Sequence, residues 1–330
     1  MAIDLKAIKP HKVSRDLRGY SVFFYGEPKS GKTTIASKFP NALLLAFEKG
    51  YNALAGVMAQ PINSWAEFIQ VTRQLRDEEV KSMYETIIID TADIAYEYCE
   101  KFICSNNDVD SVGDIAYGKG YTLVGKEFDE KLRSIVQMGY GIVLISHATD
   151  KVFKDESGQE YNKIVSTLDK RANRIVARMA DIIGYSRSVT DSEGNDRTLL
   201  FMRGTTRFEA GSRFKYTPDY IDFNYQSLVN CIDEAIKKQA EEDGQDLFTD
   251  ERENNYIDTS SHFDFDKLMS EFNKLIEKFS EDESKMATYY APRITQIIEN
   301  YLGKGKKVNE MNRDQVEQLV LIIDDLKELS

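Results

Sequence analysis

The sequence predicts an α/β protein in which helices flank a mostly parallel sheet, followed by a small C-terminal helical module. Three observations favour this fold. Four apolar runs that suit strands buried on both faces alternate with segments of helical spacing, as in a parallel sheet with helical crossovers. A glycine-bracketed loop directly follows the first of these runs. The last segments of the 330-residue chain show helical apolar spacing only.

The first apolar run, Val22–Tyr25, leads into a segment with the pattern G-x-x-x-x-G-K-T. Glycines let this backbone form a tight nest whose N–H groups converge on a polyphosphate. Lys32 supplies a cation for the β- and γ-phosphates, and the Thr33 hydroxyl can hold Mg²⁺ at the start of a helix. The alternative is a glycine-containing turn with an incidental lysine. The pattern predicts a site for ATP and Mg²⁺ formed by Gly26, Glu27, Pro28, Lys29, Ser30, Gly31, Lys32, Thr33 and Thr34.

The other buried strands are predicted at Ala42–Phe47, Thr86–Ile89 and Gly141–Ser146, because these runs are continuously apolar. Two later strands joined by a turn-rich segment suggest a mixed edge of the sheet. The remaining expected elements are helices at 64–76, 91–104, 123–138, 168–179 and 223–238, strands near 181–188 and 198–202, and long polar loops at 105–122 and 149–163.

Composition limits the environment and the partners. The odd number of cysteines, without metal-ligand spacing, favours a reduced cytoplasm. No run of about 18 apolar residues exists, so we expect neither a membrane span nor export. The net charge of −12 is unevenly distributed, with 32 basic and 33 acidic residues through position 238 and 11 against 22 beyond it. The first part of the chain is therefore free to carry a basic patch for nucleic acid.

These patterns predict four segments. Residues 1–19 form a polar leader, and residues 20–238 form the α/β core. Residues 239–262 have the charge and polarity of a flexible acidic linker. Residues 263–330 form the helical module, which we expect to bind a partner protein or to complete an oligomer.

Polar residues follow three of the predicted strands, where strand ends converge beside the phosphate loop. Asp90 follows the strand TIII and is expected to bind Mg²⁺ together with Thr33. Thr91, not a glutamate, follows Asp90, so Glu48 is the best candidate for orienting the attacking water. His147 is expected near the γ-phosphate, where it could sense whether the nucleotide is ATP or ADP. The alternatives are a turn aspartate, an exposed glutamate and an ordinary hydrogen-bonded histidine.

The order of these elements resembles the RecA-like P-loop ATPases, above all the reduced phage and prophage versions that act as recombinases or single-strand annealing proteins. The resemblance covers Tyr20–Lys238 and leaves the C-terminal module out. The segments that carry it are GEPKSGKTT, LLLAFEKGYNAL, TIIIDT, AYGKGY, VLISHATDK and FMRGTTRF.

The resemblance implies roles for particular residues. Glu48 matches the catalytic glutamate, and His147 matches a γ-phosphate sensor that is usually glutamine. The loops at 106–122 and 148–166 match segments that face DNA in a filament or ring. Arg203 and Arg207 fall near basic residues that reach the nucleotide of a neighbouring subunit and stabilise charge on its γ-phosphate. The alternative for both arginines is a surface ion pair.

The composition of the two loops agrees in part with DNA binding. Aromatic and basic side chains suit base stacking and phosphate contact. Acidic residues in the same loops leave open that both are merely solvated. The candidate DNA-binding residues are Tyr117, Lys119 and Tyr121 in the first loop and Lys151 and Lys154 in the second.

Two functions remain open at this point. The first is an ATP-dependent protein, ATP-hydrolysing and DNA-stimulated, that acts on single-stranded DNA in phage recombination, annealing or repair as a homo-oligomeric ring or filament. The second is an ATPase motor or loader in phage DNA replication that works mainly through protein partners. In either case, a single-strand-binding or replication protein is the expected partner of the C-terminal module. A third function, that of a small-molecule kinase, is less favoured, because the sequence contains no compact arginine-rich lid.

Overall fold

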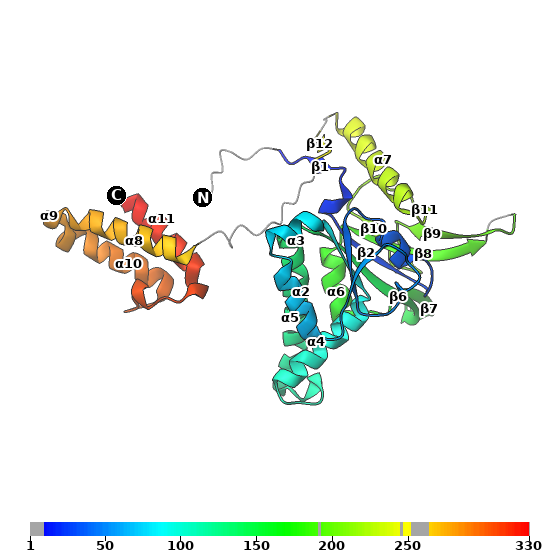
Figure 1. Ribbon diagram of the computed structural model, residues 1–330, viewed down its shortest axis with the longest axis horizontal. Coiled ribbons are helices and arrows are strands. Elements are labelled where there is room, and N and C mark those ends of the chain that lie inside the picture. Colours follow the sequence, from blue (N-terminus) through cyan, green and yellow to red (C-terminus); the bar gives the residue numbers. More distant parts are fainter. Residues whose placement is uncertain (1–9, 191–192, 245–246, 252–263, 330) are drawn as a thin grey trace. The chain divides into compact units, whose positions relative to one another are not determined.

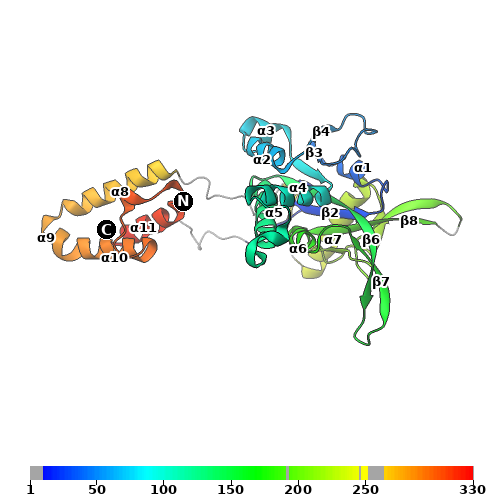
Figure 2. The ribbon, with the colours of Figure 1, turned by 90° about the horizontal axis from the view of Figure 1, so that it is seen from below.

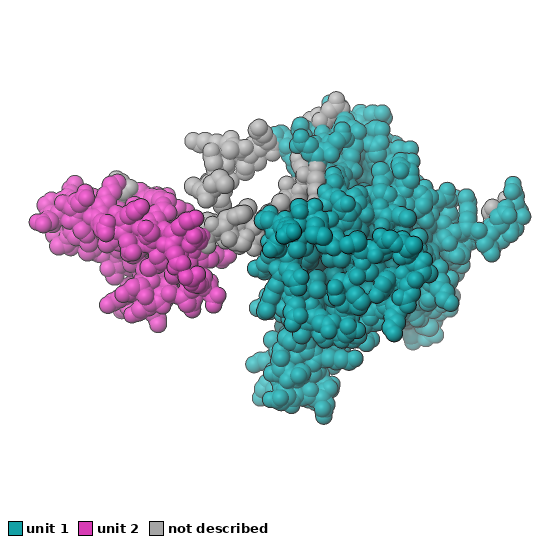
Figure 3. Space-filling view, viewed as in Figure 1, with its two compact units in different colours: residues 1–257 teal, residues 258–330 magenta. Residues whose placement is uncertain are grey.

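The structure is a computed structural model that describes residues 10–190, 193–244, 247–251 and 264–329. The chain divides into two compact units, residues 1–257 and residues 258–330 (Figure 3). The first unit has hydrophobic clusters on the two faces of a central sheet, and the second has a core of its own. No helix within the described ranges is both long enough and apolar enough to cross a lipid bilayer.

The first unit is built on a sheet whose parallel strands run in the order β8-β2-β6-β5-β3-β4. Strand β6 lies between β2 and β5, and the predicted mixed edge is confirmed, since β9 and β11 add antiparallel strands. The strands are β2 (Ser21–Gly26), β3 (Ala42–Ala46), β4 (Met58–Pro61), β5 (Thr86–Asp90), β6 (Gly141–Lys154), β7 (Glu160–Ser166), β8 (Ile182–Thr190), β9 (Asp196–Phe201), β10 (Gly211–Ser212) and β11 (Tyr220–Asp222).

Helices cover both faces of this sheet, which is why its central strands are continuously apolar (Figures 1 and 2). Ser64 caps α2, its hydroxyl accepting from the Glu67 N–H. One face is packed by α2 (Trp65–Gln74), α4 (Ala92–Asn106), α5 (Lys119–Gln137) and α6 (Lys170–Met179). The other is packed by α1 (Lys32–Ala36) and α7 (Tyr225–Asp243), and a short α3 (Glu78–Met83) precedes β5. The predicted α/β fold is confirmed.

The second predicted polar loop, 149–163, is instead a β-hairpin. Strand β6 continues past the sheet to Lys154, and β7 returns beside it, so that the hairpin projects from the body of the unit (Figure 2). The turn is closed by the Asp155 carboxylate, which accepts from the N–H groups of Ser157 and Gln159, and by Gly158 at φ +83°. Polar residues on both faces concealed this strand, because neither face is buried against a core.

The first predicted loop, 105–122, is also more ordered than its composition suggests. It holds two short 3₁₀ turns, η3 (Val112–Asp114) and η4 (Ala116–Gly118), and α5 begins at Lys119 rather than at Leu123. Gly120 lies inside this helix and packs closely against η3: a Cβ at this position would come 2.4 Å from the Val112 carbonyl oxygen. This glycine is therefore explained by close packing and not by a flexible loop.

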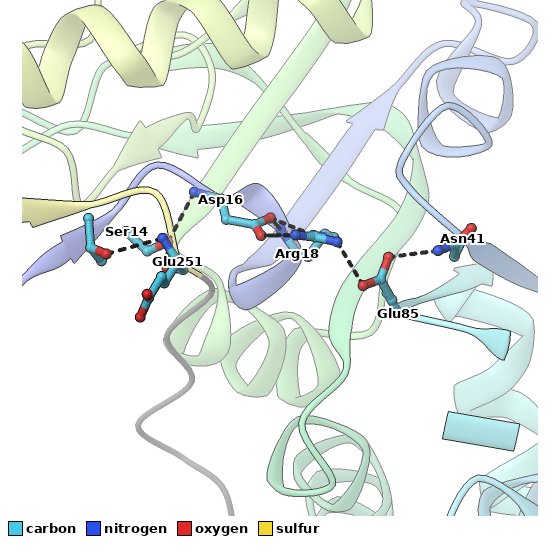
Figure 4. Close-up of polar contacts among 7 residues, drawn as sticks. Ser14, Asp16, Arg18, Asn41, Glu85 and Glu251 are labelled. Atoms are coloured by element: carbon cyan, nitrogen blue, oxygen red, sulfur yellow. Dashed lines mark hydrogen bonds and ion pairs between the residues drawn. The ribbon is translucent and has the colours of Figure 1, made fainter. Parts of the chain in front are cut away.

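The predicted leader and linker both contribute to the first unit. In a two-stranded parallel sheet, β1 (Val13–Ser14) pairs with β12 (Phe248–Thr249), and α7 continues to Asp243. The 3₁₀ turn η2 (Leu17–Gly19) buries Leu17. Figure 4 shows the polar chain that ties these segments to the starts of β3 and β5, through Glu251, Ser14, Asp16, Arg18, Glu85 and Asn41. Acidic composition alone did not reveal this pairing; residues 1–9 and 252–262 lie outside the described residues.

The second unit is helical, in agreement with its apolar spacing. Its elements are α8 (Phe265–Ser280), α9 (Glu283–Lys285), the π-helical turn η6 (Met286–Tyr290), α10 (Ala291–Leu302), the 3₁₀ turns η7 (Val308–Glu310) and η8 (Arg313–Gln315), and α11 (Val316–Leu329). Its core includes Phe272, Phe279, Ile294, Leu319, Ile322 and Leu326.

Candidate nucleotide site

The phosphate loop joins the end of β2 to the start of α1, at the edge where the parallel strands end. Gly31 has φ +94°, a left-handed conformation that glycine adopts without strain. Gly26 is required for a further reason, since a Cβ there would lie 2.1 Å from the Ser186 hydroxyl oxygen of the neighbouring β8. The loop residue Ser30 shares a 2.8 Å hydrogen bond with the same hydroxyl. Strand β8 therefore holds the phosphate loop from one side.

Lys32 is folded against the loop that it follows. Its ammonium donates to the carbonyl oxygens of Gly26 at 3.0 Å and Glu27 at 2.7 Å. Burial lowers the pKa of Lys32, because desolvation disfavours the charged form. The nearby carboxylates of Asp90 and Glu48 oppose this effect. The predicted phosphate cation thus lies inside the cradle and faces the acidic residues expected beside it.

Thr33 and Asp90 meet across the site. The Thr33 hydroxyl donates to Asp90 Oδ2 at 2.6 Å, although the two residues are 57 positions apart. Burial is the main cause that raises the pKa of Asp90, and the Thr33 bond opposes it. A buried carboxylate beside a hydroxyl offers the hard oxygen ligands that Mg²⁺ prefers. The two residues fit the metal, which in this position would neutralise phosphate charge.

Glu48 and His147 form the far wall. His147 in β6 is the register partner of Gly26, and its Nε2 lies 3.6 Å from Glu48 Oε1. The Glu48 carboxylate raises the pKa of His147, and the imidazole in turn lowers the pKa of Glu48. Among the described residues, the buried Nδ1 of His147 has no hydrogen-bond partner. The pair therefore presents a carboxylate and an imidazole to a group bound between it and the phosphate loop.

One open pocket of about 430 Å³ is bordered by Lys32, Thr33, Asp90, Glu48 and His147. A Cβ added to Gly50 would lie 3.7 Å from Glu48 Oε1 and 3.9 Å from Thr33 Oγ1, so the two polar groups face the same small space. The lining residues are Pro28, Lys29, Gly31, Lys32, Thr33, Thr34, Glu48, Gly50, Ala53, Leu54, Asp90 and His147. The geometry suits a bound triphosphate with its terminal phosphate toward Glu48 and His147.

Comparison with known proteins identifies the family of this chain. Residues 18–214 match the AAA_24 family model, an AAA domain. The chain belongs to this family of P-loop ATPases. The AAA-domain protein is also 33% identical over 340 residues to YorG of Bacillus subtilis strain 168, an uncharacterized protein derived from the SPbeta prophage, covering 100% of this chain and 99% of YorG.

Two solved structures resemble the AAA-domain protein more distantly, each at 13% identity. The KaiC-like protein PH0186 of Pyrococcus horikoshii OT3 has a TM-score of 0.38 over 65% of this chain and 94% of its own. The flagellar accessory protein FlaH of Methanocaldococcus jannaschii has a TM-score of 0.34 over 63% and 85%.

Sequence reasoning missed a half-buried aspartate behind the site. Asp93, at the start of α4, accepts hydrogen bonds on Oδ1 from the hydroxyls of Ser146 at 3.1 Å and Thr167 at 2.6 Å. Asp93 thereby connects helix α4 to the base of the β6–β7 hairpin, where Ser146 and Thr167 lie. The only signal in the sequence was its position three residues after Asp90, which by itself does not separate it from an ordinary first-turn acid.

The two candidate arginine fingers have different surroundings. The Arg203 guanidinium donates to the carbonyl oxygens of Phe214 at 2.8 Å and Lys215 at 2.5 Å, and so supports a loop of its own subunit. Arg207 is exposed, and its side chain has no ion pair within the described part of the chain. The action of either residue on a neighbouring subunit stays a prediction, and the exposed Arg207 is the better placed.

The candidate DNA-binding residues of the first segment lie in η4 and at the start of α5. Tyr117 is 97% exposed, and Lys119 is exposed at the first position of the helix. Tyr121 is less available, because the Arg171 guanidinium lies over its ring, 4.2 Å from the centroid. Their contact with DNA stays a prediction.

In the second segment, the hairpin register sorts the residues onto two faces. Lys151 pairs with Lys163, and Phe153 pairs with Tyr161, so that two cations and two aromatic rings share one face. The two rings are 6.0 Å apart. The predicted Lys154 lies on the opposite face and is paired with Glu160 at 3.4 Å. The sequence analysis expected a loop here and could not group these residues. The strand register brings Phe153, Tyr161 and Lys163 together with Lys151.

Proposed function

We propose that this protein is an ATP-hydrolysing, RecA-like ATPase that binds single-stranded DNA and uses the state of its nucleotide to set its affinity for DNA. Membership of a P-loop ATPase family supports nucleotide binding, and the prophage origin of the relative YorG supports a role in phage DNA recombination, annealing or repair. Such a protein works in the cytoplasm of the host cell.

The proposed hydrolysis uses the groups that border the pocket. Lys32 and the loop N–H groups bind the β- and γ-phosphates, and Thr33 and Asp90 hold Mg²⁺, which neutralises phosphate charge when bound. Glu48 is ionised at neutral pH, as is usual for a glutamate, and His147 lowers its pKa further. It orients the attacking water, and Arg207 of a neighbouring subunit adds positive charge at the γ-phosphate when subunits assemble.

One observation carries the link to DNA. Strand β6 runs without interruption from His147, beside Gly26, to Phe153 on the hairpin face that also holds Lys151, Tyr161 and Lys163. A change at the phosphate end of this strand is transmitted to the hairpin through the backbone that the two share. Aromatic rings that stack on bases and lysines that contact phosphates are the usual elements of single-strand binding.

The test is oligonucleotide binding by Phe153→Ala/Tyr161→Ala, with Val152→Ala/Asn162→Ala on the opposite face of the same hairpin as the control. Loss of one stacked base costs about 1–3 kcal/mol, so the affinity for single-stranded DNA should fall by roughly 5- to 150-fold. The rate of ATP hydrolysis should rise with added single-stranded DNA in the wild type and less in the aromatic variant. Equal effects in both variants would contradict the assignment of this face.

A second candidate is an ATPase motor or loader in phage replication that works through protein partners. It is favoured by the separate helical unit, on which Tyr289 and Leu321 are 41% and 47% exposed. A single-strand-binding or replication protein is the partner we propose for this unit. Hydrolysis that responds to such a protein but not to DNA would favour this second function.

A further inference from the structure

Helix α6 has a basic outer face that the site does not use. Its inner face is buried in the core through Ala172, Val176 and Met179. Its outer face carries four exposed cations, and the helix contains no acidic residue. These cations, which we call the α6 stripe, are Lys170, Arg171, Arg174 and Arg178.

The neighbouring helix α5 shows how a merely solvated face is built in the same unit. Three of its cations are paired with acids four residues away, including Lys126 with Glu130 at 3.6 Å and Arg133 with Asp129 at 2.7 Å. Within the described ranges, no cation of the α6 stripe has an ion pair. Like charges at this spacing destabilise a helix by a few tenths of a kcal/mol per pair. The stripe is thus present at some cost in stability.

The flanking carboxylates do not neutralise the stripe. Asp169 caps the helix, accepting from the Arg171 N–H at 2.7 Å. Asp181, beyond the other end, accepts from the Ser21 N–H at 2.8 Å and pairs with Arg213 at 3.2 Å. Lys170, Arg174 and Arg178 follow one another at intervals of four residues, so they form a row with a step of about 6 Å.

We infer that the α6 stripe contacts the phosphate backbone of a nucleic-acid strand. This inference rests on the proposed function and adds a second part to its DNA surface. Guanidinium groups bind phosphate oxygens in a bidentate manner, and an evenly spaced row of cations matches an evenly spaced row of phosphates. At one end of the stripe, Arg171 over Tyr121 adds an aromatic surface.

The position of α6 supports the same partner. The helix begins at Lys170, four residues after β7 ends at Ser166, so the stripe follows directly on the strand that carries Tyr161 and Lys163. A nucleic-acid strand bound on the hairpin face would therefore reach the base of the hairpin, near Ser166, where the α6 stripe begins. An acidic protein segment is the competing occupant.

The experiment compares two triple variants with the same change in charge. Lys170→Ala/Arg174→Ala/Arg178→Ala removes the row and keeps Arg171 on Tyr121. The control, Lys215→Ala/Lys237→Ala/Lys238→Ala, removes three cations that already have partners on or beside α7, against the opposite face of the sheet. The binding of a fluorescent oligothymidylate is measured as a function of salt concentration.

Each phosphate contact contributes about 0.7 to the slope of log affinity against log salt for a single strand, so the stripe variant should lose about 2 from this slope. The control should keep the wild-type slope. Arg174→Gln/Arg178→Gln, a milder variant, should lose about 1.4. ATP binding by each variant establishes that it is folded, because the substituted side chains are exposed and outside the nucleotide pocket.

The outcomes separate the inference from the proposed function. If the wild type binds no oligonucleotide at any salt concentration, the proposed function fails and the inference fails with it. Suppose that the wild type binds the oligonucleotide and that Phe153→Ala/Tyr161→Ala weakens this binding. If the stripe variant then has the same salt dependence of affinity as the control, only the inference is overturned. The stripe would then be a surface for an acidic protein.

Discussion

Replacing Glu48 by glutamine tests the assignment of the residue that orients water. The substitution keeps the size of the side chain and an oxygen toward His147, but it removes the negative charge. General bases contribute about 10²- to 10⁴-fold to a rate. Because His147 lowers the pKa of Glu48, this carboxylate is a weak base, and we expect the lower end of that range. The hydrolysis rate should fall about 100-fold, or roughly 2.7 kcal/mol.

The assay is phosphate release at saturating ATP and magnesium, with the dissociation constant of a fluorescent ATP analogue measured in parallel. Glu78→Gln is a matched control, since that carboxylate lies on α3 with 85% of its side chain exposed. Nucleotide affinity should be retained in both variants. If Glu48→Gln hydrolyses ATP within threefold of the wild type, the activating carboxylate is elsewhere and the reasoning is refuted.

Three other predictions follow from the same site. Lys32→Ala should weaken ATP binding by roughly 10- to 150-fold, the worth of a hydrogen bond to a charged group, in a titration with magnesium; unchanged affinity would exclude the phosphate cradle. The pKa of His147, measured by NMR, should exceed 6.5 and fall in Glu48→Gln. In the wild type the stabilising charge pair is fully present between about pH 4.5 and 6.5; it is lost as pH rises through the raised pKa of His147, and also as pH falls through the lowered pKa of Glu48. Gly26→Ala should lower the free energy of unfolding by about 1–3 kcal/mol in urea, because the new Cβ overlaps Ser186; an unchanged midpoint would show that β8 moves away freely.

Much of the fold could be predicted because strands buried on both faces leave a local signal. The runs that became β2, β3, β5 and β6 are continuously apolar, and the phosphate loop is contiguous in the chain. The two predicted polar loops were wrong for opposite reasons. The hairpin of β6 and β7 has no buried face to impose alternation, and Gly120 is packed inside α5 rather than placed in a flexible turn.

The candidate site divides in the same way. Lys32, Thr33 and Asp90 could be found because each adjoins a pattern with its own chemistry. Asp93 and Ser186 could not, because their roles depend on partners far away in the chain, at Thr167 and Ser30. A hydrogen bond across such a separation leaves no periodic trace in the sequence.

The sequence by itself determined that this chain forms a parallel sheet with a phosphate loop at its first crossover, because both follow from short contiguous patterns. The tertiary structure alone decided which residues share a face or a hydrogen bond. Strand register brings Gly26 beside both His147 and Ser186, and it places Phe153 opposite Tyr161. Register is set by pairing between distant segments, and a shift of one residue would turn every one of these side chains to the other face.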